Sequence, residues 1–282
     1  MIRKAFLVDS LVDGPFSGAP TSVVFLESPM DKFKMLSLAN EIGTSQTVYV
    51  LMHDQASYLL RFFSRTQELP LGGHSCHAAA HLIYELGFSP PGEELVFLTQ
   101  EGEISARRVP PDQTAVRFAA QAFNKMDQNN VSLYSDILGL SPRSVAWAGI
   151  TQNRQAILAV DASAPLRRLE PVREKLLNSG ATTLAVTAPD SSAGCDYSLR
   201  CFTPGLLFPE HLVSATVHRS LAPQWGRLLR KTRLQCRQLS SRGGLVLLDV
   251  SDPGRVLMTA KSRTVMRSDV VMEMMDSYLD PL

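Results

Sequence analysis

The sequence predicts an α+β protein made of two similar halves. Runs typical of strands and of amphipathic helices alternate along the chain, separated by glycine, proline and polar turns. One short unit also recurs, because Arg61-Phe62-Phe63-Ser64 is echoed roughly 140 residues later by Arg200-Cys201-Phe202-Thr203. Each copy is followed by a loop, a helix and a pair of strands. The repeat therefore predicts a pseudo-twofold protein, in which two helix N-termini can point at one cleft between the halves.

The composition is that of a globular protein with a sizeable core. Of its 282 residues, 45% are hydrophobic and 20% are charged, and the formal net charge is +1. No basic stripe runs along the chain, so nucleic acid is not an expected partner. No segment is apolar for long enough to span a membrane, and Asp9 interrupts the first apolar run too early for a signal peptide. The four cysteines form no Cys-x-x-Cys pair, which favours the cytoplasm.

The first half contains the clearer local signals. Asp31 is expected to cap a helix that runs to Glu41 and stops at Gly43. A hairpin is expected around Glu101-Gly102, between strands at 95–99 and 103–108. Further strands are predicted at 5–9, 21–26, 46–51, 58–63 and 115–118.

A polar run at 124–132 marks the expected boundary between the two halves. The predicted domains are residues 1–122, joined by the C-terminal segment 266–282, and residues 123–265. Helices are predicted at 133–138 and 170–177, and from Ser214 onward. Strands are predicted at 145–150, 156–160 and 182–187, and as a pair within 234–250.

The stretch from Leu69 to Ala80 reads as an extended segment, a glycine turn and the start of a buried helix. Gly72 and Gly73 leave the first N–H groups of that helix uncovered, so its positive end suits a carboxylate. His74 stands at the same place, where the cationic form of a histidine is disfavoured and a proton can be exchanged near neutral pH. The same three residues also occur in plain turns, and His74 can equally serve as a hydrogen-bond donor without proton transfer.

The order and spacing of several motifs resemble those of the PhzF-like family of phenazine-biosynthesis proteins, which has the diaminopimelate-epimerase-like fold. The matching stretches are Phe16-Ser17-Gly18-Ala19-Pro20, Ala39 to Thr47, Leu71-Gly72-Gly73-His74-Ser75, Glu210 to His218, and Ser241-Arg242-Gly243-Gly244. The resemblance implies two pseudo-symmetric halves, each a curved, mostly antiparallel sheet around a central helix, with the active site between them. It also implies a cofactor-independent acid/base isomerase, usually a homodimer, that acts on a small carboxylate-bearing intermediate in secondary metabolism.

The chain departs from the family pattern at the positions that move protons. Gln46 replaces the family's glutamate, and an amide has no titratable proton near neutral pH. His211 replaces the aspartate, and the two cysteines of diaminopimelate epimerases would fall at Gly72 and Ser214, which excludes thiol-based racemisation. The expected catalytic residues are therefore His74, His211 and Gln46, and the expected substrate-binding residues are Ser45, Gly72, Gly73, Ser214, Ala215 and Thr216.

No metal site is expected. His74, His77 and His81 share one helix face, but the outer two lie on the order of 10 Å apart along the helix, too far for one zinc ion. His77 and His81 are interpreted as core or dimer-interface residues. Two alternatives to the isomerase stay open. One is lyase, cyclase or hydrolase chemistry on the same scaffold, and the other is a non-catalytic small-molecule-binding relative.

Overall fold

A computed structural model describes residues 2–161, 164–204, 210–211 and 214–271 of the chain. By its internal contacts the chain divides into two compact units. Unit 1 contains residues 2–12, 19–117 and 259–271 of the described part, and unit 2 contains residues 13–18 and 118–258. The domain boundary expected at residue 122 stays a prediction, because the two units are groups of residues in contact and do not establish independently folding domains.

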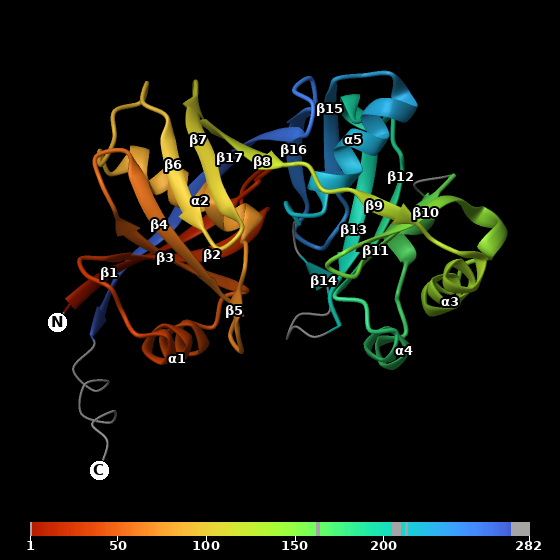
Figure 1. The fold of residues 1–282 in the computed structure, drawn as a ribbon, viewed down its shortest axis with the longest axis horizontal. Coiled ribbons are helices and arrows are strands. Elements are labelled where there is room, and N and C mark those ends of the chain that lie inside the picture. The colour runs from red at the N-terminus through yellow and green to blue at the C-terminus, as the bar shows by residue number, and fades with distance from the viewer. Residues whose placement is uncertain (1, 162–163, 205–209, 212–213, 272–282) are drawn as a thin grey trace, which may run out of the picture. The chain divides into compact units, whose positions relative to one another are not determined.

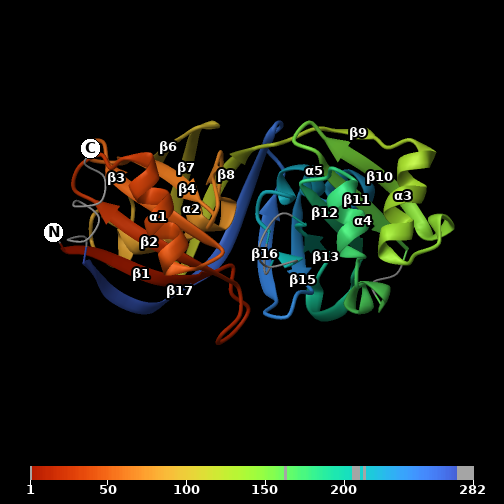
Figure 2. The ribbon, with the colours of Figure 1, turned by 90° about the horizontal axis from the view of Figure 1, so that it is seen from below.

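Unit 1 is a mostly antiparallel sheet around one helix (Figures 1 and 2). The central helix α2 (Gly73–Glu85) contacts β1, β2, β3 and β7, and every residue from Gly73 to Ala80 is buried. A second helix, α1 (Lys32–Ile42), packs through Met35 and Leu38 on Tyr49 and Phe63 of the sheet. The strands are β1 (Ile2–Ser10), β2 (Ala19–Leu26), β3 (Gln46–Met52), β4 (Ser57–Phe63), β5 (Glu68–Leu69), β6 (Leu95–Thr99), β7 (Gly102–Val109), β8 (Gln113–Ala119) and the unit-1 part of β17 (Arg255–Val271).

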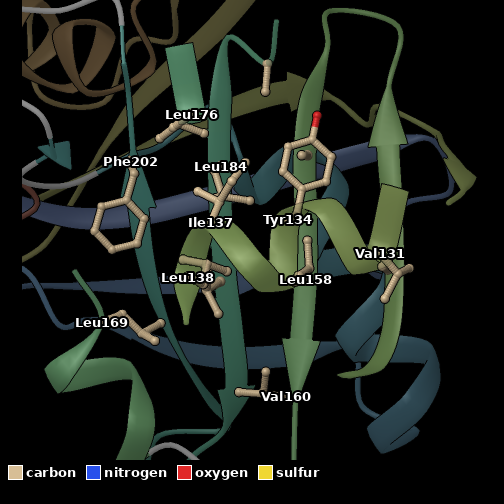
Figure 3. Packing of buried hydrophobic residues seen from close by; sticks show 14 of the residues in the cluster. Val131, Tyr134, Ile137, Leu138, Leu158, Val160, Leu169, Leu176, Leu184 and Phe202 are labelled. Carbon is tan, nitrogen blue, oxygen red and sulfur yellow. The ribbon is translucent and has the colours of Figure 1, made fainter. Parts of the chain in front are cut away.

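Unit 2 is built in the same way around α5 (His218–Leu229), which binds the sheet through Trp225 and His218. Helix α3 (Gln128–Leu138) covers the other face with Val131, Tyr134, Ile137 and Leu138, which pack on β11 to β13 (Figure 3). Helix α4 (Arg173–Asn178) adds Leu176 to this core. The strands are β9 (Phe123–Lys125), β10 (Val145–Thr151), β11 (Gln155–Val160), β12 (Thr183–Pro189), β13 (Tyr197–Phe202), β14 (Glu210–His211), β15 (Arg233–Gln238) and β16 (Gly244–Asp249).

Strand pairing shows that the two units share one topology. In unit 1 the pairs β1–β2, β3–β4, β4–β5 and β6–β7 are antiparallel, whereas β2–β3 and β4–β6 are parallel. In unit 2 the pairs β10–β11, β12–β13, β13–β14 and β15–β16 are antiparallel, whereas β11–β12 and β13–β15 are parallel. The registers also correspond, because Thr47 pairs with Phe63 and Leu184 pairs with Phe202. The internal repeat and the two pseudo-symmetric halves are therefore confirmed.

The structure corrects the start of three predicted helices. Helix α3 begins at Gln128 rather than residue 133, because the Asp127 side chain accepts the N–H of Asn130 and caps it inside the polar run. Helix α4 begins at Arg173 rather than residue 170, since the residue before Pro171 is disfavoured in a helix and the N-cap is Val172, whose N–H donates to Ile137 O. In unit 2 the α-helix begins at His218 rather than Ser214, because the preceding residues form tighter turns, with His218 N–H donating to Ala215 O.

Candidate functional site

The N-terminus of α2 begins directly after an extended segment and is not capped by a side chain. Gly72 is the N-cap residue, with an extended backbone, and it lies three residues after the end of β5. The first α-helical hydrogen bond runs from Cys76 N–H to Gly72 O at 2.9 Å. The N–H groups of Gly73, His74 and Ser75 therefore precede the helical ladder and carry the positive end of the helix dipole.

Gln46 lies beside this first turn because a serine of the helix holds it there. The Ser75 hydroxyl donates to Gln46 Oε1 at 2.6 Å, and both side chains are buried. The amide oxygen thereby has one donor, whereas the amide nitrogen makes no hydrogen bond within the described part of the chain. Gln46 can thus present an N–H donor to a bound molecule, but it cannot accept a proton as a carboxylate does.

Gly72 is required by this packing. A Cβ at residue 72 would lie 2.6 Å from Gln46 Oε1 and 2.6 Å from Phe62 Cδ1, closer than carbon atoms approach in folded proteins. Two of the predicted residues, Gln46 and Gly72, are therefore adjacent in unit 1, and Ser75 joins them. Sequence reasoning assigned no role to Ser75 or Phe62. The only sequence signal for Ser75 was its position in the Leu71-to-Ser75 motif.

His74 and Ser45 complete the predicted group in unit 1. His74 is the second residue of α2, and its side chain is 3% exposed. Ser45 precedes β3 and is half-buried, and its hydroxyl donates to the Pro20 carbonyl at 3.1 Å. This bond ties the entry of β3 to β2. Because the Ser45 hydroxyl donates in this bond, its oxygen lone pairs remain available to accept a hydrogen bond from a ligand.

The other two histidines of α2 have structural partners. His77 is fully buried, its Nδ1 lies 2.9 Å from Thr114 Oγ1, and burial lowers its pKa to about 3. His81 Nε2 lies 2.8 Å from Glu85 and 3.1 Å from Thr264, and burial lowers the pKa of its imidazole despite the carboxylate. Within the described ranges, no three His, Cys, Asp or Glu side chains form a group that could hold a metal ion.

In unit 2 the corresponding stretch precedes α5. The Ser214 N–H donates to Gln238 Oε1 at 3.0 Å, so this predicted donor already has a partner in β15. Ala215 is buried and Thr216 is half-buried, and both belong to the turn before α5. His211 pairs through its backbone with Cys201 in β14–β13, and its side chain lies outside the part that the structure describes. Gln238 is a further residue that the sequence did not single out.

An arginine–glutamate pair braces the strands that lead into each central helix. In unit 1, Arg61 Nε and Nη2 donate to the two carboxylate oxygens of Glu68 at 2.7 and 3.0 Å. In unit 2, Arg200 makes the same two bonds to Glu210 at 2.8 and 2.9 Å. Each guanidinium also lies over a ring of its own strand, Phe63 or Phe202. The repeat is therefore preserved in side-chain contacts as well as in topology.

The arginine–glutamate pair of unit 1 also affects titration. The hydrogen bonds from Arg61 lower the pKa of Glu68, assisted by Lys32 at 3.0 Å. This carboxylate is therefore ionised and held in place near neutral pH, which fixes β5 immediately before the glycine turn.

The four cysteines are buried and form no disulfide. Burial raises the pKa of Cys201 and Cys236 well above its usual range, so their thiols are not poised as nucleophiles. No helix in the described part of the chain combines the length and apolar composition needed to span a bilayer.

Comparison with known proteins identifies similar chains. The sequence profile of the family described as phenazine biosynthesis-like protein (PhzC-PhzF) matches residues 8–268. An uncharacterized isomerase of Pseudomonas aeruginosa is 32% identical over 262 residues, which cover 93% of this chain and 96% of that protein. An uncharacterized isomerase of Halalkalibacterium halodurans is 27% identical over 275 residues, which cover 96% and 100%. The crystal structure of a PhzF-family protein from Enterococcus faecalis superposes with a TM-score of 0.84 at 24% identity, covering 96% of this chain and 100% of that one.

Proposed function

The chain belongs to the family of phenazine biosynthesis-like proteins, and from this premise we propose that it is a cofactor-independent isomerase that moves a proton on a small carboxylate-bearing substrate. The relatives named as isomerases support this reaction type. The observation that carries the proposal is the first turn of α2, where a buried histidine, a helix N-terminus and an amide donor lie together.

In this proposal the N–H groups of Gly73 and Ser75 bind the substrate carboxylate. They lie at the positive end of a 13-residue buried helix, which favours a negative charge. His74 moves the proton, because it is the titratable side chain of that turn. Gln46 donates from its amide nitrogen to a substrate oxygen, since the Ser75 hydroxyl holds the oxygen end of the amide toward α2.

The remaining assignments rest on the family resemblance alone. His211 is proposed as a second proton-transfer residue, and Ser45, Ser214, Ala215 and Thr216 as substrate-binding residues. A cytoplasmic homodimer with a role in secondary metabolism is proposed on the same ground.

Solvent deuterium tests the reaction type without knowledge of the substrate. The protein is incubated in D₂O with a panel of cyclic and unsaturated carboxylates, and each compound is analysed by mass spectrometry and proton NMR. Carbon-bound deuterium in a substrate or its isomer is the expected result. Conversion of a compound without deuterium incorporation contradicts the proposal and supports lyase, cyclase or hydrolase chemistry on this scaffold.

A non-catalytic binding protein is the second candidate, and the Gln46–Ser75 bond is the observation that favours it. This bond holds an amide where the family has a carboxylate, so the binding features are kept while one proton-transfer group is absent. Saturable binding of a carboxylate with neither conversion nor deuterium exchange would establish this candidate.

A further inference from the structure

Unit 2 contains a cavity of about 740 Å³, and none of its lining residues was given a catalytic or substrate-binding role above. One wall is a face of α5, formed by Ser220, Pro223, Gln224 and Arg227. These positions are three, four and seven residues apart and so lie on one side of the helix. The opposite wall comes from β9 and β10, with Phe123, Lys125 and Trp147. We call this feature the Trp147 cavity. Its volume is in the range of pockets that bind small molecules.

The β9–β10 wall is aromatic and well supported. The rings of Phe123 and Trp147 are nearly parallel, at 13°, with centroids 5.7 Å apart. Trp147 also meets Trp225 edge to face, with centroids 6.0 Å apart. Gly149 allows Phe123 to lie flat on β10, because a Cβ at that residue would overlap the ring. The two rings are both half-buried, so they give the cavity a fixed, partly open aromatic surface.

The cavity is positively charged. Among the described residues, its lining includes two cations, Lys125 and Arg227, and no carboxylate. Arg227 donates to the Gln224 amide oxygen at 2.9 Å, and neither cation forms an ion pair within the described residues. Uncompensated charges of one sign in a concave site favour an anionic ligand.

Ser220 provides an independent indication of a ligand. Its side chain is 2% exposed, and its Oγ has no hydrogen-bond partner among the described residues. Buried hydroxyl groups in folded proteins are almost always hydrogen-bonded, so the Ser220 hydroxyl is available to donate to a ligand or a water in this cavity. Ser220 and Arg227 are separated by seven residues of α5, on the order of 10 Å along the helix.

We propose that the Trp147 cavity binds a planar aromatic acid about two fused rings long. Its rings stack on Phe123 and Trp147, its acid group lies between Lys125 and Arg227, and an oxygen at its far end accepts the Ser220 hydroxyl. This ligand satisfies the three features together: aromatic surface, positive charge, and a buried donor on the order of 10 Å along α5 from Arg227. The site lies along α5 and is separate from the first turn of α2, so it does not depend on the proposed isomerase activity.

The test uses calorimetric titration of the full chain with 6-hydroxy-2-naphthoate, which carries a carboxylate and a hydroxyl at opposite ends of a planar bicycle. Binding with a Kd below roughly 100 μM is expected, typical of a partly open site for a ligand of this size. Arg227→Gln is expected to raise the Kd about tenfold, because one charge-assisted hydrogen bond is lost. The neutral carboxamide of the same bicycle should bind at least tenfold more weakly.

Ser220→Ala has a matched control in Ser135→Ala. Ser135 is also buried, and its Oγ has no partner in the described part of the chain, but it belongs to α3 and does not line the cavity. Both substitutions should leave the unfolding midpoint unchanged or higher, since neither hydroxyl has a partner to lose. Only Ser220→Ala should raise the Kd, about fivefold, and it should not affect 2-naphthoate, which lacks the hydroxyl.

Three results would overturn the proposal: no saturable binding of 6-hydroxy-2-naphthoate at millimolar concentration, equal affinity for the carboxamide, or unchanged Kd values in Arg227→Gln and Ser220→Ala. Arg227 is exposed, so its substitution should leave the fold intact and tests the site directly.

Discussion

The Ser75 hydroxyl donates to Gln46 Oε1 at 2.6 Å and joins the first turn of α2 to the first residue of β3. The two residues are 29 positions apart in sequence, and both are buried. This bond sets which end of the Gln46 amide is available to a ligand. It is therefore the contact on which the stability of the turn and the proposed role of Gln46 both depend.

A double-mutant cycle should show that Ser75 and Gln46 are coupled. Ser75→Ala leaves the Gln46 amide oxygen buried without its donor and should lower the free energy of unfolding by about 1–3 kcal/mol. The double variant Ser75→Ala/Gln46→Ala should lose less free energy of unfolding than the two single variants lose in sum. The coupling energy measured by urea titration should be at least about 0.5 kcal/mol. Ser10→Ala, which removes a buried hydroxyl that has no partner among the residues the structure describes, serves as the control and should be close to neutral. Additive single changes would show that the two side chains do not interact in solution.

Gly72→Ala should destabilise the protein by about 1–3 kcal/mol, because the new methyl group overlaps Gln46 and the buried ring of Phe62. Gly92→Ala is the matched control, since a Cβ there meets no atom of the described residues within 4 Å. Urea unfolding of the two variants measures the difference. Equal stabilities would mean that the turn before α2 is looser than the structure shows.

Stability should fall between pH 7 and pH 5 because of two buried histidines. Burial lowers the pKa of both His77 and His218 to about 3, whereas an unfolded histidine titrates near 6.5. Between those values the unfolded state binds more protons, so the free energy of unfolding decreases as the pH falls, by about 2 kcal/mol per histidine down to pH 5. The pH dependence is measured by urea unfolding.

Replacing these histidines one at a time identifies their contributions. His77→Gln and His218→Gln should each remove about 2 kcal/mol of the loss between pH 7 and pH 5, and His53→Gln, at an exposed position, serves as the control. The pH dependence would have another origin if neither buried substitution reduced it.

Much of the fold could be predicted because its signals are local. Asp31 caps α1 with its carboxylate, and Gly43 ends it at a φ of 80°, as the sequence indicated. The repeat was visible because the arginine, the phenylalanine and the loop after them occur in both halves. The same arginines and phenylalanines take part in the two arginine–glutamate pairs. The long strand β17 was missed, although Val256, Met258 and Ala260 alternate inward along it, because its second half becomes largely exposed.

The candidate site was predictable in its residues but not in its contacts. Gly72, Gly73 and His74 mark a helix N-terminus locally, and α2 begins there. The Ser75–Gln46 bond, the contact of Gly72 with Phe62, and the Gln238 bond to Ser214 depend on strand register, which no single segment encodes. The Trp147 cavity likewise combines α5 with β9 and β10, which lie far apart in sequence.

Gln46→Glu should increase proton exchange. The Ser75 hydroxyl can donate to either an amide or a carboxylate oxygen, so the substitution fits the same space and adds a group that accepts protons. A general base contributes about 10²–10⁴-fold, so the rate of deuterium incorporation should rise at least tenfold. Gln46→Asp is the control, because its carboxylate is one methylene short of the same position and should give a smaller gain. A Gln46→Glu variant no faster than the parent would show that proton transfer at this residue does not limit the rate.

The most direct test of the proposed function compares deuterium incorporation by the parent chain, His74→Asn and His81→Gln under identical conditions in D₂O. His81 lies on the same helix as His74 but binds Glu85 and Thr264. The proposal predicts that His74→Asn lowers the rate per folded molecule at least 100-fold, as expected for loss of an acid/base group, and that His81→Gln retains the parent rate. Deuterium incorporation at the parent rate in His74→Asn would contradict it.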